Sequence, residues 1–149
     1  MTKLVVATEA IASGEVSRRQ LARQYTKLHR NVYHLNGVEL TAADRAHAAW
    51  LWSGRRATVA GLSAAALLGS RWVPAAGPAE LIRIHHNAPP GIIVHKDDVA
   101  DDELCHIGVI SCTTVARTVF DIDRWLPFEQ GAIRVDALLN ATDVAVGEV

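Results

Sequence analysis

The sequence has few cysteines and no long apolar segment, and each scarcity excludes a class of protein. The two cysteines, Cys105 and Cys112, are too few for the disulfide framework of a small secreted domain. No apolar run approaches the roughly 20 residues that a membrane-spanning helix needs. The first residues contain neither an apolar signal-peptide segment nor a small-residue cleavage site. We therefore expect a soluble, cytoplasmic protein with no membrane contact.

The chain also lacks the sequence motifs of common catalytic sites. It has no glycine-rich phosphate loop and no nucleophile elbow. A metal-dependent nuclease needs converging carboxylates with a nearby lysine on a strand. Here Glu80 begins a strand-like segment without a following lysine, Lys96 lies at a loop edge, and the chain has only three lysines. We expect no catalytic residue, no cofactor and no enzymatic activity.

Charge is distributed unevenly along the 149 residues, although the net charge is only −1. Residues 1–56 contain nine Lys or Arg against four Asp or Glu, whereas residues 57–149 contain six against twelve. Such asymmetry suggests an N-terminal part that faces an anion. The alternative is chance clustering, because the excess is only five charges. The hydrophobic content of 50% is ordinary for a globular protein that buries a core.

Two short helices are predicted near the start of the chain. The small and apolar residues of 6–13 favour a first helix, which Gly14 would end in the left-handed conformation. Ser17 can cap a second helix from Arg18 to about Tyr25. The predicted inward face of this helix consists of Leu21, Ala22 and Tyr25.

A hairpin is predicted after these helices. Residues 27–35 alternate enough to be strand-like, Asn31 tolerates positive φ, and Asn36-Gly37 is a strong turn signal. Helix, turn, arginine-bearing helix and hairpin follow one another as in a winged helix-turn-helix. A full winged helix has three helices before its wing, and only two fit here. We therefore predict a reduced winged helix-turn-helix over residues 1–40, called the head below.

Donor-rich side chains are concentrated on the second helix and the hairpin of the head. Cations bind phosphate, arginine can bind guanine through two hydrogen bonds, and glutamine can pair with adenine. The alternative is a helix face that is only solvated. The residues expected to contact DNA are Arg18, Arg19, Gln20, Arg23, Lys27, His29 and Arg30.

Residues 41–149, called the body below, are predicted to form an α+β structure with a small mixed or antiparallel sheet packed with helices. Thr41 and Asp44 form a capping arrangement for one helix. Further helices are predicted at 62–68, after Thr113 or Thr114, and from Pro127; strands are predicted at 80–85 and 91–95, with a hairpin centred near Ile107-Gly108. In the last two helices the residues expected to be buried are Val115, Val119, Ile122, Phe128, Ala132 and Leu139. We expect the chain to end before a missing C-terminal domain.

Several metal-capable side chains occur in the body, namely His85, His86, His95, Cys105, His106 and Cys112. Their spacings match no tetrahedral pattern with two close pairs of ligands. The predicted hairpin puts Cys105 near Ile110 and Cys112 opposite Glu103, so the cysteines would not face each other. We expect no metal site.

An acidic loop follows the second predicted strand of the body. Its carboxylates repel one another unless a cation, a helix N-terminus or a basic partner offsets them. The segment lacks the glycine and the alternating carboxylates of a calcium loop. We predict a surface that binds a protein partner, the alternative being a solvated loop, at Asp97, Asp98, Asp101, Asp102 and Glu103. Arg117 and Asp121 are expected to form a simple ion pair contributing a few tenths of a kcal/mol.

Four segments carry a resemblance to a known family. They are Ser17-Arg-Arg-Gln-Leu21, His29-Arg-Asn-Val-Tyr33, Leu62-Ser-Ala-Ala-Ala-Leu67 and Thr113-Thr-Val-Ala-Arg-Thr-Val-Phe-Asp-Ile122. Together they resemble the AbiEi-type antitoxin family over roughly residues 8–146. More closely, they are similar to actinobacterial relatives in which this region precedes a very-short-patch-repair-like endonuclease domain. The resemblance implies a winged helix that binds operator DNA and represses a toxin–antitoxin operon, with a nucleotidyltransferase-type toxin as partner.

The sequence departs from that family at several positions. Asn31 replaces the usual glycine of the wing, and Val115 stands where proline is usual. The nuclease-like domain is absent, so no nuclease activity is implied. We expect a non-enzymatic, antitoxin-like DNA-binding regulator of a toxin–antitoxin or phage-defence operon. Two alternatives are an interaction module that restrains a toxin through its acidic face, and the specificity half of a nuclease whose catalytic domain is missing.

Overall fold

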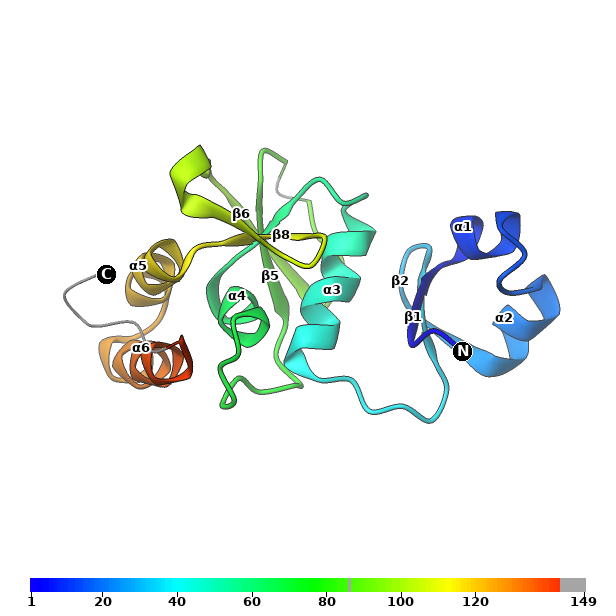
Figure 1. Ribbon diagram of the computed structural model, residues 1–149, viewed down its shortest axis with the longest axis horizontal. Coiled ribbons are helices and arrows are strands. Elements are labelled where there is room, and N and C mark those ends of the chain that lie inside the picture. The colour runs from blue at the N-terminus through cyan, green and yellow to red at the C-terminus, as the bar shows by residue number, and fades with distance from the viewer. Residues whose placement is uncertain (86, 143–149) are drawn as a thin grey trace.

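The computed structural model describes residues 1–85 and 87–142 and has an α+β architecture (Figure 1). Over these residues it contains six α-helices, a three-stranded antiparallel sheet and a five-stranded mixed sheet. The smaller sheet lies with α1 and α2 at one end of the molecule, and α5 and α6 lie at the other (Figure 1). This confirms the predicted α+β class and, of the two predicted sheet types for the body, the mixed one.

The head contains two helices between its first and second strands. The elements are β1 (Leu4–Val6), α1 (Ala7–Ala12), α2 (Arg18–Gln24), β2 (Tyr25–His29) and β3 (Val32–Leu35). The strands pair antiparallel in the order β1-β3-β2, so the strand before the helices pairs with the last strand of the hairpin. The predicted first helix therefore starts one residue late, since Leu4–Val6 form a strand instead.

The hairpin of the head turns at Arg30 and Asn31, and a second turn follows β3 at Asn36-Gly37, where the sequence predicts one. Asn31 has a φ of 65°, as its residue type predicts. Its side-chain oxygen accepts a hydrogen bond from the Thr8 backbone amide at 3.1 Å, and its side-chain nitrogen donates one to the Thr8 hydroxyl at 2.9 Å. The hairpin turn is therefore fixed on the first residues of α1.

Both faces of the small sheet are covered. One face packs beneath α1 and α2 through a cluster of Val5, Ala10, Val16 and Tyr25. Leu4 and Val32 belong to the main core together with residues of α3 (Ala42–Trp52). Alternation along β1 explains this division, because successive side chains point to opposite faces. Ala22, expected to face inward, is exposed, and Leu21 is the residue of α2 that packs against this cluster.

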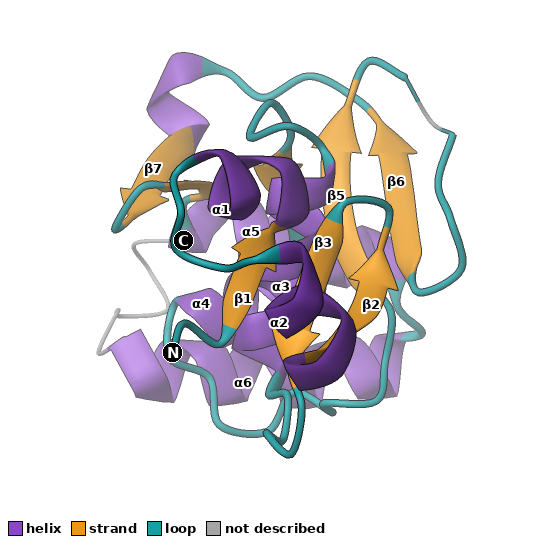
Figure 2. Cartoon of the chain, turned by 90° about the vertical axis from the view of Figure 1, so that its right-hand side faces the viewer, coloured by secondary structure: helices purple, strands orange, loops and turns teal. Residues whose placement is uncertain are grey.

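The body is built around the five-stranded sheet. Its elements after α3 are β4 (Thr58–Val59), α4 (Gly61–Leu67), β5 (Ala79–Arg83), β6 (Ile92–Lys96), the 3-10 helix η1 (Asp101–Glu103), β7 (Leu104–Ile107), β8 (Ile110–Thr113), α5 (Val115–Trp125) and α6 (Phe128–Thr142). The strand order is β6-β5-β4-β8-β7, in which β5 pairs parallel with β6 and β4 pairs parallel with β8. Figure 2 shows β5 and β6 side by side at one edge.

Helix α3 forms where the sequence predicts it. The Thr41 hydroxyl accepts from the Asp44 amide at 3.1 Å, and the Asp44 carboxylate accepts from the Thr41 amide at 2.9 Å. Ala46, Ala49, Trp50 and Ser53, which share one face at helical spacing, are all buried. None of the helices within the described residues is long and apolar enough to cross a membrane.

The buried face of α6 differs from the predicted one. Ile122 of α5 and Leu138 of α6 are buried together, with Val115 and Val119 partly buried against them. Phe128 is 82% exposed, however, and Ala132 is exposed as well. The buried residues of α6 are Gly131 and Leu138. The helix therefore packs through the side that carries Gly131 and Leu138, seven residues apart, and leaves Phe128 and Ala132 in solvent.

Candidate functional site

Helix α2 presents the arginines of the head at the outer end of the molecule. The backbone amide of Gln20 donates to the Ser17 hydroxyl at 3.0 Å, and the backbone amide of Ser17 donates to Gln20 Oε1 at 2.8 Å. This capping box fixes the start of a helix of only seven residues. Arg18, Arg19 and Arg23 are exposed on it. In Figure 2, which views that end of the molecule, α2 lies in front of the small sheet.

Lys27 and Arg30 extend this charged surface to the hairpin. Both side chains are exposed. Lys27 lies on the same sheet face as Tyr25, which packs with the helix side of the head, because residues two apart on a strand share a face. Within residues 1–85 and 87–142, neither these two cations nor the three arginines of α2 form a salt bridge. We call Arg18, Arg19, Arg23, Lys27 and Arg30 the basic surface.

Two residues expected to contact DNA are engaged elsewhere. The side-chain carbonyl of Gln20 caps its own helix, so it is not available to accept from adenine. His29 is only 8% exposed, and its ring packs beside Gly91. A Cβ added to that glycine would lie 3.6 Å from His29 Cε1. Burial, followed by the positive charge of Arg45, lowers the pKa of His29 below its ordinary value. His29 was expected to contact DNA, but it is buried at the end of β2, which is irregular between Lys27 and His29.

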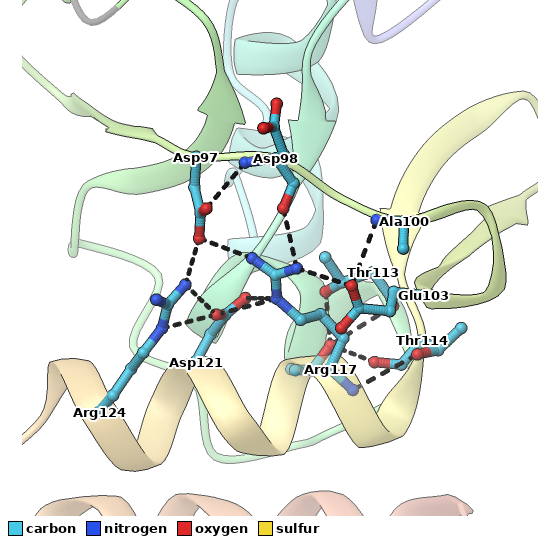
Figure 3. Close-up of polar contacts among 10 residues, drawn as sticks. Asp97, Asp98, Ala100, Glu103, Thr113, Thr114, Arg117, Asp121 and Arg124 are labelled. Atoms are coloured by element: carbon cyan, nitrogen blue, oxygen red, sulfur yellow. Dashed lines mark hydrogen bonds and ion pairs between the residues drawn. The ribbon is translucent and has the colours of Figure 1, made fainter.

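The acidic loop does not project as a whole into solvent. Asp97 and Glu103 turn inward onto Arg117, which is only 5% exposed (Figure 3). Arg117 Nη2 lies 2.8 Å from Asp97 Oδ2, and Nη1 lies 3.1 Å from Glu103 Oε1 and 3.0 Å from the Asp98 carbonyl oxygen. The loop is therefore wrapped around a guanidinium group of the body.

Asp121 and Arg124 complete this cluster from the same helix. Arg117 Nε donates to both Asp121 oxygens at 3.1 and 3.2 Å, and Asp121 is completely buried. Arg124 Nη2 lies 2.6 Å from Asp121 Oδ1 and 2.6 Å from Asp97 Oδ2 (Figure 3). Hydrogen bonding from Arg124 lowers the pKa of Asp97. We call Arg117, Arg124, Asp97, Glu103 and Asp121 the arginine cluster.

The local sequence explains why α5 presents these groups together. Thr114 caps the helix, with its hydroxyl 3.4 Å from the Arg117 amide. Positions 117, 121 and 124 then lie on one helix face, because three- and four-residue steps return to the same side. The sequence indicated the Arg117–Asp121 pair, although as a weak ion pair, and it missed Arg124. The spacing of Arg124, three residues after Asp121, is the signal that could have found it.

Three acidic side chains remain on the surface. Asp98, Asp101 and Asp102 are exposed and have no salt-bridge partner among the residues that the structure describes. The predicted partner-binding set is thus divided, with Asp97 and Glu103 turned toward the interior.

The predicted metal-capable residues do not converge. His86 lies outside the described residues. Within residues 1–85 and 87–142, no group of three or more His, Cys, Asp or Glu side chains is arranged to hold a metal ion. His95 lies 3.2 Å from Glu80 Oε1 and stacks on Trp125 with a centroid distance of 3.5 Å. Glu80 in turn accepts from the Leu62 amide at 2.8 Å, so this group connects β5 and β6 to α4 and α5.

The hairpin register corrects the expectation for the two cysteines. Cys105 and Cys112 are directly opposite each other on β7 and β8. The turn falls at Gly108 and Val109, one residue later than predicted, because Gly108 adopts a φ of 61°. This shift moves Cys112 from the predicted position opposite Glu103 to the position opposite Cys105.

No protein-family model matches this chain, and a search of curated proteins found no match.

Proposed function

We propose that the chain is a non-enzymatic, DNA-binding regulator that contacts duplex DNA through the basic surface. The observation that supports this most strongly is that five exposed cations of the head have no salt bridge within the described residues. Other cations do have internal partners, as in Lys3–Asp44 at 2.7 Å and Arg55–Glu9 at 2.8 Å. Cations without internal partners are free to bind phosphate.

The order of elements gives independent support to a reduced winged helix-turn-helix. Two helices joined by a short turn precede a hairpin, and the strand before the helices pairs with the hairpin's last strand. The second helix carries the arginines and lies at an outer end of the molecule, where a duplex can approach it (Figure 1). Arg18, Arg19 and Arg23 are suited to phosphate or guanine contacts, and Lys27 and Arg30 to the adjoining phosphates.

The test measures how binding to duplex DNA depends on salt concentration. The DNA is taken from the region upstream of the gene that encodes this chain. About four to six phosphate contacts give a slope of log K against log salt of roughly −4 to −5. Arg18→Ala with Arg23→Ala should weaken binding and make the slope about 2 units shallower. A matched control is Arg71→Ala, an exposed arginine of the body, which should change neither quantity. Absence of wild-type binding at low salt would overturn the proposal.

Regulation of a toxin–antitoxin or phage-defence operon is proposed from the resemblance to AbiEi-type antitoxins. On that basis the protein partner would be a nucleotidyltransferase-type toxin. The exposed carboxylates of Asp98, Asp101 and Asp102 favour a basic partner surface, because they have no cation of their own among the described residues. Charges of this kind chiefly accelerate association.

The proposed role of these carboxylates in binding a protein partner is tested with the triple variant Asp98→Asn, Asp101→Asn and Asp102→Asn. It should slow association with the toxin encoded in the same operon and make it less sensitive to salt, while DNA binding stays unchanged. Unaltered association at low salt would refute the role of these carboxylates and leave the DNA-binding proposal standing.

A further inference from the structure

Two cysteines of the body lie opposite each other on neighbouring strands. Cys105 on β7 and Cys112 on β8 are paired directly across an antiparallel ladder. Both sulfur atoms lie close to the Thr113 carbonyl oxygen, at 3.6 and 3.4 Å. Both cysteines are free thiols.

The two thiols differ in their access to solvent. Cys112 is completely buried in the main core, whereas Cys105 is partly exposed on β7, an edge strand of the five-stranded sheet. A dissolved reagent can therefore reach Cys105 first, and Cys112 is placed to react only with Cys105.

We propose that Cys105 and Cys112 form a dithiol site that reacts with small disulfides of the glutathione type to give an intramolecular disulfide. In the first step the Cys105 thiol loses its proton and its sulfur attacks the external disulfide. A mixed disulfide forms and one external thiolate leaves. In the second step Cys112 loses its proton and attacks the Cys105 sulfur, which releases the second external thiolate. The two cysteines are oxidised by two electrons, and the external disulfide is reduced to two thiols.

The backbone geometry accommodates this bond. Opposed residues in an antiparallel ladder have Cα atoms about 4.5 or 5.5 Å apart, depending on the kind of pair. Both values fall within the roughly 4.4–6.8 Å that disulfides span. Burial raises the pKa of both thiols, so the reaction is slow at neutral pH and accelerates as pH rises.

The bond would join an edge strand to its inner neighbour. Strand β7 follows Glu103, and β8 leads to Thr114 and α5, so the bond would tie together the two segments that meet at the arginine cluster. Helix α2 belongs to the other sheet, and DNA binding should be unaffected.

The experiment treats the folded full-length chain with oxidised glutathione at pH 8 to 9 and follows its mass and free thiols. The wild type should lose two hydrogens and both free thiols without gaining glutathione, and dithiothreitol should reverse this. Cys112→Ala should stop at one glutathione on Cys105, since the second step is impossible. Cys105→Ala should remain unmodified while folded, since Cys112 is buried.

Three outcomes would overturn the site: a wild type that keeps both thiols, one that stops at the mixed disulfide, or one that forms only disulfides between chains. The wild-type measurements alone decide this, so a variant that folds poorly does not weaken the test. Intact DNA binding by the oxidised protein separates this result from the proposed function of the head.

Discussion

The arginines of α2 and those of α5 bear the same guanidinium group in opposite surroundings. Arg18, Arg19 and Arg23 are exposed and form no salt bridge within the described residues. Arg117 is only 5% exposed and donates to three carboxylates and a carbonyl, and Arg124 shares two of those carboxylates. The comparison separates cations that stabilise the fold from cations that are free to bind something outside it.

The two environments have different energetic consequences. Removing one partner of a buried ion pair leaves a desolvated charge without compensation, which is strongly destabilising. An exposed cation without a partner contributes little to folding, since water solvates it equally well in the unfolded chain. Stability should therefore depend on the arginine cluster, and DNA binding on the basic surface.

Arg117→Ala should give the largest loss of stability. It leaves the fully buried Asp121 with only Arg124, and it releases Glu103 and the Asp98 carbonyl from their shared donor. We expect the free energy of unfolding to fall by about 3–5 kcal/mol, measured by urea denaturation followed by circular dichroism.

Arg124→Ala is the matched control for this measurement. Its side chain is 35% exposed, and Asp121 and Asp97 both keep Arg117, so we expect a loss of only about 1 kcal/mol. Equal losses for the two variants would show that burial does not distinguish these arginines.

His29 extends the comparison to the head, where one residue expected at the DNA surface is buried instead. Its pKa is lowered by burial and by Arg45, so the folded protein binds the proton more weakly than the unfolded chain does. The contribution of His29 to the free energy of unfolding should be constant above its ordinary pKa of 6.5. It should fall as pH drops below 6.5, until pH passes the pKa of His29 in the folded state.

The measurement is the free energy of unfolding between pH 7.5 and 5 for the wild type and His29→Gln. The variant should show a smaller decrease, although not a flat profile, because burial also lowers the pKa of His47. Parallel profiles for the two proteins would mean that His29 is as solvated as the arginines of α2.

Features determined by neighbouring residues were predictable from the sequence. The capping box of Thr41 and Asp44, the positive φ of Asn31 and the capped start of α5 at Thr114 each depend on interactions within a few residues. Helical spacing likewise identified Ile122 as buried. Local signals likewise predicted the order of α1, α2 and the hairpin, but they missed β1, whose partner β3 is distant in sequence.

Features determined by distant segments were not predictable in the same way. Asp97 and Glu103 precede Arg117 by 20 and 14 residues, and only the folded sheet brings the loop to the helix. The buried side of α6, with Gly131 and Leu138, is set by packing against α5, which a pattern of large apolar residues does not encode. A turn displaced by one residue was enough to separate Cys105 from Cys112 in the predicted hairpin, because pairing register follows the turn.

The smallest effect is expected when Arg18, Arg19 and Arg23 are replaced together by alanine. Alanine is the best helix former, and the capping box of Ser17 and Gln20 is untouched, so α2 should persist. Substitutions of exposed side chains without partners usually change stability by less than about 0.5 kcal/mol. Removing three like charges also relieves mutual repulsion, so any change should favour folding at low salt. Urea denaturation of this variant, beside its DNA-binding curve, tests both halves of the comparison at once. Unchanged unfolding together with lost binding assigns these arginines to an external anion, whereas a loss above about 1 kcal/mol would show that they hold the head together.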